Sequence, residues 1–136
     1  MPLTNGFNHV ATLTTDLDRF ADWYGRVFGA TVVHEIVKSE HHPRMFIVDM
    51  GGGAALNVFE VDRTDIIGEQ RRQGGRGAID HFGLSVETLE DLQAVKARLE
   101  EAGADIGEIQ RLGNEWSLFF RDVDGMELEV CTKYAE

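Results

Sequence analysis

Two histidines and one glutamate stand at matched positions of a sequence that repeats itself, and these residue types can bind a divalent metal ion. The stretch NHVA at residues 8–11 recurs as DHFG at residues 80–83, and LNV at 56–58 corresponds to LEV at 128–130, both 72 residues later. Two imidazoles and a carboxylate on one side of a divalent cation leave coordination positions open for other ligands. We therefore predict that His9, His81 and Glu129 form a metal site.

Each half of the chain has the same order of predicted elements: one strand, one helix and three more strands. Alternating apolar and polar residues indicate the strands, and Gly29 and Gly103 are typical of helix ends. The predicted strands are residues 7–14, 31–38, 44–50 and 54–61 in the first half, and 79–86, 105–112, 116–121 and 126–132 in the second. Helix N-caps are expected at Thr15, with Asp18, and at Thr88, with Asp91.

The repeat predicts the fold class and the domain organisation. We expect an α+β fold in which two βαβββ modules in tandem form a curved sheet with the helices on its outer face. One domain, residues 1–136, would contain a first module at 6–61, a linker at 62–77 and a second module at 78–133. The helix faces turned to the sheet are predicted to be Leu17, Phe20, Tyr24 and Val27 in the first module, and Leu89, Leu92, Lys96 and Leu99 in the second.

The alternation of side chains along a strand predicts on which face of the sheet each of these residues lies. Val10, Phe82, Leu56, Val58, Leu128 and Val130 are expected to face the helices. His9, His81, Asn57 and Glu129 have the opposite parity and are expected to face away from them. They would converge on one concave surface if the two modules pair, either within one chain or by exchange between two chains.

Composition and charge exclude several classes of function. The chain of 136 residues has 13 basic and 24 acidic residues, a net charge of 13 − 24 = −11, which disfavours contact with nucleic acids and anionic membranes. It contains neither an apolar run of about 20 residues nor the features of a signal peptide. One cysteine, Cys131, fits a reducing compartment. We expect a cytoplasmic protein that binds neither nucleic acid nor membrane.

Four segments resemble motifs of the vicinal oxygen chelate superfamily, which includes glyoxalase I, fosfomycin-resistance proteins, methylmalonyl-CoA epimerase, extradiol dioxygenases and bleomycin-resistance proteins. The segments are FNHV at 7–10, DLDRF at 16–20 followed by WYGRVFG at 23–29, DHFGL at 80–84, and DVDGMELE at 122–129. The resemblance covers nearly the whole chain. Val123 and Met126 depart from the commonest form of the last motif, where Pro and Asn are usual.

The resemblance implies an enzyme that uses a divalent metal, Fe²⁺, Mn²⁺, Zn²⁺ or Ni²⁺, to act on a small substrate with two neighbouring oxygens, and it implies a homodimer. Glyoxalase I-like members carry a fourth ligand, usually Glu, where this chain has Asn57. Glu60 lies nearby but has the opposite parity, so we expect it at the helix side or the strand end. A neutral amide is a poor ligand for a hard cation. The resemblance therefore favours three-ligand members, such as extradiol dioxygenases and fosfomycin-resistance proteins.

Two other functions stay open at this point. One is a metal-free protein that binds small molecules, of the drug-sequestering bleomycin-resistance type. The other is a glyoxalase I-like lyase or an epimerase, against which Asn57 argues.

Four residues are predicted to contact the substrate: Asn57, Phe59, Trp116 and Phe119. Ordinary core packing is the alternative for the three aromatic residues. His41 and His42 could line the mouth of a pocket, but a solvated loop is favoured, and Tyr134 could act as a proton donor near the last strand. Cys131 shares the parity of Glu129 and is interpreted as a packing residue.

Overall fold

The computed structural model describes residues 2–68 and 78–133, and these form two compact units, Met1–Ile66 and Ile67–Glu136. We call them unit 1 and unit 2. The division falls inside the predicted linker 62–77, of which residues 69–77 lie outside the described part of the chain. The module boundaries at 6–61 and 78–133 stay predictions. No helix among the described residues is long and apolar enough to span a membrane.

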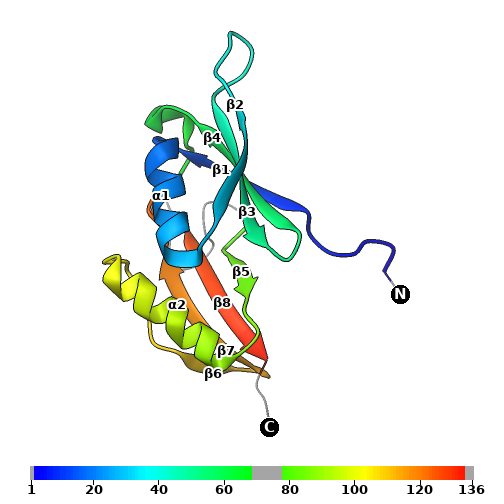
Figure 1. Ribbon diagram of the computed structural model, residues 1–136, viewed down its shortest axis with the longest axis vertical. Helices are drawn as coiled ribbons and strands as arrows, with labels where there is room; N and C mark the ends of the chain where they lie inside the picture. The colour runs from blue at the N-terminus through cyan, green and yellow to red at the C-terminus, as the bar shows by residue number, and fades with distance from the viewer. Residues whose placement is uncertain (1, 69–77, 134–136) are drawn as a thin grey trace. The chain divides into compact units, whose positions relative to one another are not determined.

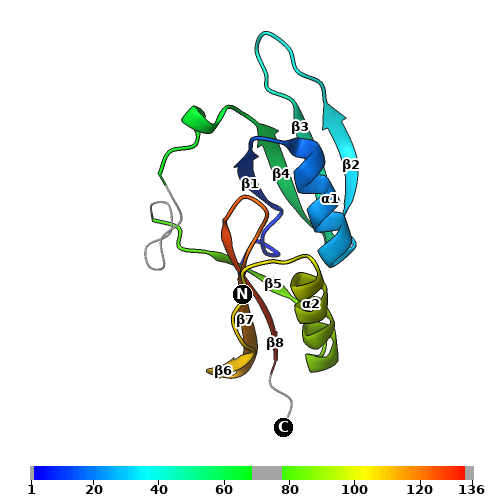
Figure 2. The same cartoon turned by 90° about the vertical axis from the view of Figure 1, so that its left-hand side faces the viewer.

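Unit 1 has the predicted βαβββ order, followed by one short helix. Its elements are β1 (His9–Thr14), α1 (Leu17–Phe28), β2 (Thr31–Ile36), β3 (Met45–Gly51), β4 (Ala54–Glu60) and the 3₁₀ helix η1 (Arg63–Asp65). The sheet order is β1-β4-β3-β2, with β1 and β4 parallel and the other pairs antiparallel. Helix α1 covers one face of this sheet (Figure 2).

Unit 2 repeats this plan. Its elements are β5 (Phe82–Ser85), α2 (Leu89–Glu101), β6 (Gln110–Leu112), β7 (Glu115–Arg121) and β8 (Glu127–Lys133), in the sheet order β5-β8-β7-β6 (Figure 1). The prediction of an α+β fold with tandem βαβββ modules is confirmed. The predicted strand 105–112 is much shorter, since only Gln110–Leu112 pairs as a strand and Ile106 makes an isolated bridge with Phe120.

The strand registers show that the two units are structural repeats. In unit 1, parallel pairing of β1 with β4 places Val10 beside Leu56 and Ala11 beside Asn57. In unit 2, the pairing of β5 with β8 places Phe82 beside Leu128 and Gly83 beside Glu129. Every member of the second set follows its counterpart by 72 residues. The repeat read from the sequence is therefore also a repeat of backbone pairing.

Each unit has its own core, which lies between its helix and its sheet. The buried strand residues include several that the alternation of side chains predicted to face the helix. Leu56, Val58, Leu128 and Val130 are almost fully buried, and so are Leu17, Phe20, Tyr24 and Val27 of α1. In α2 the buried residues are Leu92, Val95 and Leu99, so Val95 takes the place that was predicted for Lys96. Lys96 lies one position further round the helix, where its ammonium contacts Glu100 and Glu108 at 3.5 and 3.6 Å.

Both helices begin with a side-chain cap that satisfies a free backbone N–H. The Thr88 side chain accepts a hydrogen bond from the Asp91 backbone N–H, as predicted. The cap of α1 is Asp16 and not Thr15, because the Asp16 carboxylate accepts from the Arg19 N–H at 3.0 Å. A carboxylate also suits the positive end of the helix dipole better than a neutral hydroxyl does. Gly29, in the left-handed conformation (φ 70°), ends α1.

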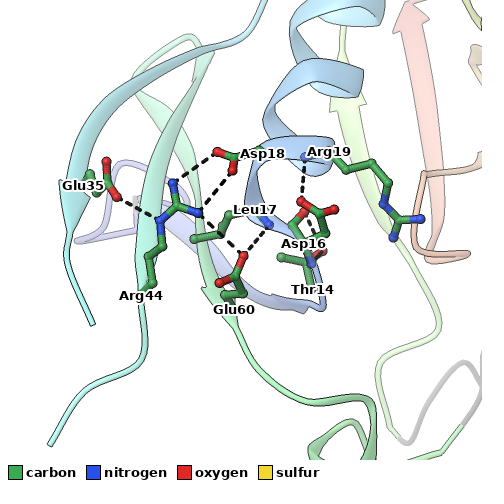
Figure 3. A network of polar contacts seen from close by, with 8 residues as sticks. All are labelled: Thr14, Asp16, Leu17, Asp18, Arg19, Glu35, Arg44 and Glu60. Atoms are coloured by element: carbon green, nitrogen blue, oxygen red, sulfur yellow. Dashed lines mark hydrogen bonds and ion pairs between the residues drawn. The ribbon is translucent and has the colours of Figure 1, made fainter. Parts of the chain in front are cut away.

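A cluster of charged residues in unit 1 joins the start of α1 to three strands (Figure 3). The Arg44 guanidinium, placed just before β3, contacts Glu35 of β2 at 2.9 Å, Asp18 of α1 at 3.1 Å and Glu60 of β4 at 3.7 Å. Hydrogen bonds to Asp18 and Glu35 raise the pKa of Arg44 above its ordinary value. We call these four residues the Arg44 cluster. It connects segments that are distant in the chain, unlike an ion pair within one helix.

We predict that Arg44→Ala lowers the free energy of unfolding by about 1 kcal/mol, because one cation serves three carboxylates in this network. Arg26→Ala is the matched control, since Arg26 makes an exposed i,i+4 pair with Asp22 and its loss should cost under about 0.5 kcal/mol. Urea unfolding at low and high salt measures both, and the Arg44 effect should shrink as salt screens the charges. Equal effects of the two variants would contradict a structural role of the cluster.

Candidate metal centre

Unit 2 brings two of the three predicted ligands into contact. Glu129 lies in β8 beside Gly83, and His81 comes directly before β5, so the parallel pairing carries both side chains to the sheet face opposite α2. The His81 Nε2 atom lies 3.1 Å from the Glu129 Oε1 atom. Both side chains are largely buried, with exposed fractions of 28% and 18%. An imidazole and a carboxylate that share one partly buried place suit a divalent cation.

The remaining polar atoms of these two side chains also have partners. The Nδ1 atom of His81 lies 2.7 Å from the Asp80 carboxylate, and the Ser117 hydroxyl donates to Oε2 of Glu129. The Phe119 ring meets the His81 ring edge-on, with centroids 5.1 Å apart. Polar and aromatic contacts therefore fix the orientation of His81 and Glu129, and the atoms that face each other are Nε2 and Oε1.

The electrostatics of this place favour a cation. Burial lowers the pKa of His81, but hydrogen bonds to Asp80 and Glu129 and the negative charges of both outweigh that effect, so the pKa is raised above its ordinary value. Burial, together with the charges of Glu129 and Glu115, raises the pKa of the Cys131 thiol to about 11. Cys131 is therefore a protonated thiol, which agrees with its interpretation as a packing residue.

In unit 1, His9 and Asn57 occupy the equivalent positions. His9 begins β1 and is exposed, with its Nδ1 atom 2.8 Å from the Asn8 side-chain oxygen. Asn57 is half-buried beside Ala11, as Glu129 lies beside Gly83. Asn57 alternates with the buried residues Leu56 and Val58, so it lies on the face away from α1. Unit 1 thus presents an imidazole and an amide where unit 2 presents an imidazole and a carboxylate.

Glu60 does not take the place of the missing carboxylate of unit 1. Its Oε2 atom accepts a hydrogen bond from the Leu17 backbone N–H at 2.9 Å, at the start of α1. The same atom lies 3.7 Å from the Arg44 guanidinium. The expectation that Glu60 points to the helix side or the strand end is therefore confirmed.

The three aromatic residues predicted to contact substrate fall on different faces. Phe119 pairs with Glu129 across β7 and β8 and shares its face. Phe59 is two residues beyond Asn57 on β4 and lies on the same face as Asn57. Trp116 pairs with Thr132 and has the parity of the buried residues Leu118 and Phe120. The predicted contact of Trp116 with substrate stays a prediction. The place of Trp116 on the helix side of the sheet argues against it.

The other candidates have simpler surroundings. His41 is exposed, as expected of a solvated loop, whereas His42 is half-buried with Nδ1 2.6 Å from the Pro43 carbonyl oxygen and its ring 5.8 Å from that of Phe59. Tyr134 lies outside the described residues. Asn8, Asp80 and Ser117 were missed at the level of sequence, although Asn8 and Asp80 match in the repeat and each precedes a predicted ligand.

Within either unit taken by itself, the described residues gather no group of three His, Cys, Asp or Glu side chains that could hold a metal ion. Unit 2 supplies the pair His81 and Glu129, and His9 belongs to unit 1. The assignment of all three residues to one metal ion therefore stays a prediction.

Comparison with known families identifies the fold family. The model of the Glyoxalase/Bleomycin resistance protein/Dioxygenase superfamily matches residues 6–130. The chain belongs to this superfamily. Among its curated relatives, the metallothiol transferase FosB of Shouchella clausii (strain KSM-K16) is 32% identical over 134 residues, which cover 96% of this chain and 82% of FosB. The trivalent organoarsenical cleaving enzyme of Bacillus sp. (strain MD1) is 28% identical, over 84% of this chain and 72% of that enzyme.

A third superfamily relative is longer than this chain. It is a protein of Bacillus subtilis (strain 168) named for ring-cleaving dioxygenase activity, MhqA, and it is 30% identical over 129 residues. The match covers 91% of this chain and 39% of MhqA. This chain therefore corresponds to less than half of that relative. The three relatives are named for different reactions, so membership of the superfamily does not name the reaction of this chain.

Solved structures of the superfamily agree with the fold. A glyoxalase/bleomycin resistance protein/dioxygenase domain from Frankia sp. EAN1pec has a TM-score of 0.77 at 28% identity, covering 96% of this chain and 93% of that one. A variant of the fosfomycin resistance protein FosX from Listeria monocytogenes has a TM-score of 0.72 at 14% identity, covering 98% and 95%. That structure contains Mn(II) and 1S,2S-dihydroxypropylphosphonic acid.

We predict that Asn57→Glu tightens metal binding, because the change places a carboxylate in unit 1 where unit 2 has Glu129. Isothermal titration with Mn²⁺ measures the dissociation constant, which should fall at least about tenfold. Asn57→Gln is the matched control, as it lengthens the side chain by the same amount without adding charge. A dissociation constant that Glu leaves unchanged would mean that position 57 does not face the ion.

Proposed function

We propose that this chain is a divalent-metal-dependent vicinal oxygen chelate enzyme, in which His9, His81 and Glu129 hold the ion and a small substrate with two neighbouring oxygens binds to it. The metal is one of Fe²⁺, Mn²⁺, Zn²⁺ or Ni²⁺. His9 completes the set, supplied either by the same chain or by the second copy in a homodimer. Of the reactions known in the superfamily, the proposal favours those of three-ligand members, such as dioxygenases.

The observation that carries this proposal is the contact between His81 and Glu129. Their Nε2 and Oε1 atoms lie 3.1 Å apart, with Glu129 in β8 and His81 directly before β5, and the far atoms of both side chains have hydrogen-bond partners. The donor set fits a divalent ion, because a neutral imidazole and a carboxylate are ligands for all four of these metals. The Mn(II) in the FosX variant supports the same class of ion, although that protein is only 14% identical.

Each residue of the proposed site has a separate task. His9, His81 and Glu129 hold the ion, which when bound supplies a Lewis acid for two substrate oxygens. The Asn57 amide lies where a fourth ligand would otherwise stand, and its NH₂ group donates a hydrogen bond to a substrate oxygen. Phe119 shares the face of Glu129 in unit 2, and Phe59 shares the face of Asn57 in unit 1, beside the His42 ring.

The relatives support enzymes of two different reaction types. MhqA is named for ring cleavage with oxygen and FosB for thiol transfer, at 30% and 32% identity. FosB is matched over 82% of its length and MhqA over 39%, so thiol transfer is the second candidate reaction. A metal-free binding protein of the bleomycin-resistance type and a glyoxalase I-like lyase or epimerase are the remaining alternatives.

We predict that His81→Ala removes the metal from the purified protein, because the change deletes one ligand and breaks the contact with Glu129. Elemental analysis should find about one ion per chain in the parent protein and almost none in the variant. His41→Ala is the matched control, since His41 is an exposed loop residue. Full metal content in His81→Ala would refute the ligand assignment.

The reaction is tested on the metal-loaded protein with one assay for each candidate. Oxygen uptake with catechols supports a dioxygenase, and loss of free thiol in the presence of fosfomycin supports a transferase. Isomerisation of a hemithioacetal would instead support the glyoxalase alternative. Stabilisation by a small ligand that survives EDTA, without turnover, would support the metal-free binding protein and contradict the proposal.

A further inference from the structure

Four side chains of unit 2 form a continuous row of hydrogen bonds. Asp80 Oδ2 lies 2.7 Å from Nδ1 of His81, and Nε2 of His81 lies 3.1 Å from Oε1 of Glu129. The Ser117 hydroxyl then donates to Oε2 of Glu129. The two inner members are the proposed ligands, and the two outer members would not touch a metal ion. The outer members therefore determine which atoms of the ligands stay available.

We propose that Asp80 and Ser117 are positioning residues of the metal site, an inference that rests on the proposed function. Asp80 selects Nε2 as the ligating atom of His81. Ser117 occupies one oxygen of Glu129, so that this carboxylate binds the ion through Oε1 only. With both in place, His81 and Glu129 each bind the ion through one atom, and more coordination positions of the ion stay open for substrate.

The argument for Asp80 is one of tautomers. A carboxylate can only accept a hydrogen bond, so the His81 nitrogen beside Asp80 carries the proton. Nε2 faces a second carboxylate, Glu129, so without an ion both ring nitrogens donate. When the Nε2 proton gives way to a cation, Nδ1 keeps its proton beside Asp80, and the lone pair of the ring lies on Nε2. A carboxylate partner also makes the imidazole a stronger metal ligand than a neutral partner does.

The argument for Ser117 is one of burial and geometry. Ser117 is fully buried in the middle of β7, so its hydroxyl needs a partner inside the protein, and Glu129 provides it. The neighbouring strands fix the position of this serine. This hydrogen bond fixes the direction of Oε2, so a two-oxygen arrangement of Glu129 around the ion would have to bend or break it.

Unit 1 offers a natural comparison, because Asn8 stands where unit 2 has Asp80. The Asn8 side-chain oxygen lies 2.8 Å from Nδ1 of His9, so it selects the same tautomer, but through a neutral amide. The two proposed histidine ligands therefore differ in the strength of their support. The reciprocal exchanges Asp80→Asn and Asn8→Asp keep the size of the side chain and change its hydrogen bonding and its charge.

The affinity test uses Mn²⁺ and the full chain, and it follows free Mn²⁺ by its electron paramagnetic resonance signal. At a pH where both imidazoles are neutral, Asp80→Asn should raise the dissociation constant about tenfold or more, and Asn8→Asp should lower it. Glu87→Gln, in the exposed turn between β5 and α2, is the charge control and should have little effect. If Asp80→Asn and Glu87→Gln weaken Mn²⁺ binding equally, Asp80 acts only through its negative charge, and its positioning role is wrong.

The Ser117 test counts the water molecules on bound Mn²⁺ through the relaxation rate of solvent protons. In Ser117→Ala the freed oxygen of Glu129 can join the ion and displace a water, so the relaxivity of each bound Mn²⁺ should fall. Ser117→Thr keeps the hydroxyl and should restore the parent value. Circular dichroism and thermal melting confirm that each variant is folded.

The outcomes separate this inference from the proposed function. If the parent protein binds Mn²⁺ while Asp80→Asn and Ser117→Ala match it in affinity and relaxivity, the positioning role is wrong and the metal site stands. If the folded parent protein binds none of Mn²⁺, Fe²⁺, Zn²⁺ and Ni²⁺, the proposed function is wrong and this inference fails with it.

Discussion

The parallel pairing of the first and last strand in each unit is the constraint on which the candidate site depends. A strand pair with fixed register allows only two directions for each side chain, and burial of the helix-facing set decides between them. In unit 2, full burial of Leu128 and Val130 against α2 leaves Glu129 on the opposite face, beside His81. A slip of one residue would bury the carboxylate in the apolar core, so the energetics of the core also enforce the place of the proposed ligand.

The two units share a backbone plan but use their charged residues differently. Unit 1 places charge at the start of its helix, where Arg44 and Glu60 connect α1 to the sheet. At the positions 72 residues later, unit 2 has Trp116 and Thr132, both on the helix-facing side. Its outer face carries Glu129 in place of Asn57. Arg44 and Glu60 of unit 1 thus stabilise the fold, whereas Asp80 and Glu129 of unit 2 lie beside His81.

The helix-facing and outward-facing residues of one βαβββ plan are under different constraints. The helix-facing residues satisfy packing and leave little freedom for change, since a core tolerates neither gaps nor buried charge. The outward-facing residues of the same strands are less constrained by packing, so an exchange at position 57 between an amide and a carboxylate would change the proposed site without disturbing the core. The helix-facing residues therefore determine the fold, and the outward-facing residues of the same strands determine the chemistry of the proposed site.

The amino-acid sequence by itself determined the repeat, the order of elements and the faces on which Asn57, Glu60 and Glu129 lie, because periodicity and parity are local properties of the chain. It missed the cap at Asp16 and the packing of Val95, since neighbouring helix positions differ too little in pattern. Only the tertiary structure decided that Glu60 bonds to the helix start, that Trp116 lies on the helix side and that Asp80 and Ser117 flank the proposed ligands. These contacts join residues that are distant in the sequence. They depend on the register of the paired strands and on side-chain conformations, and neither follows from the local sequence pattern.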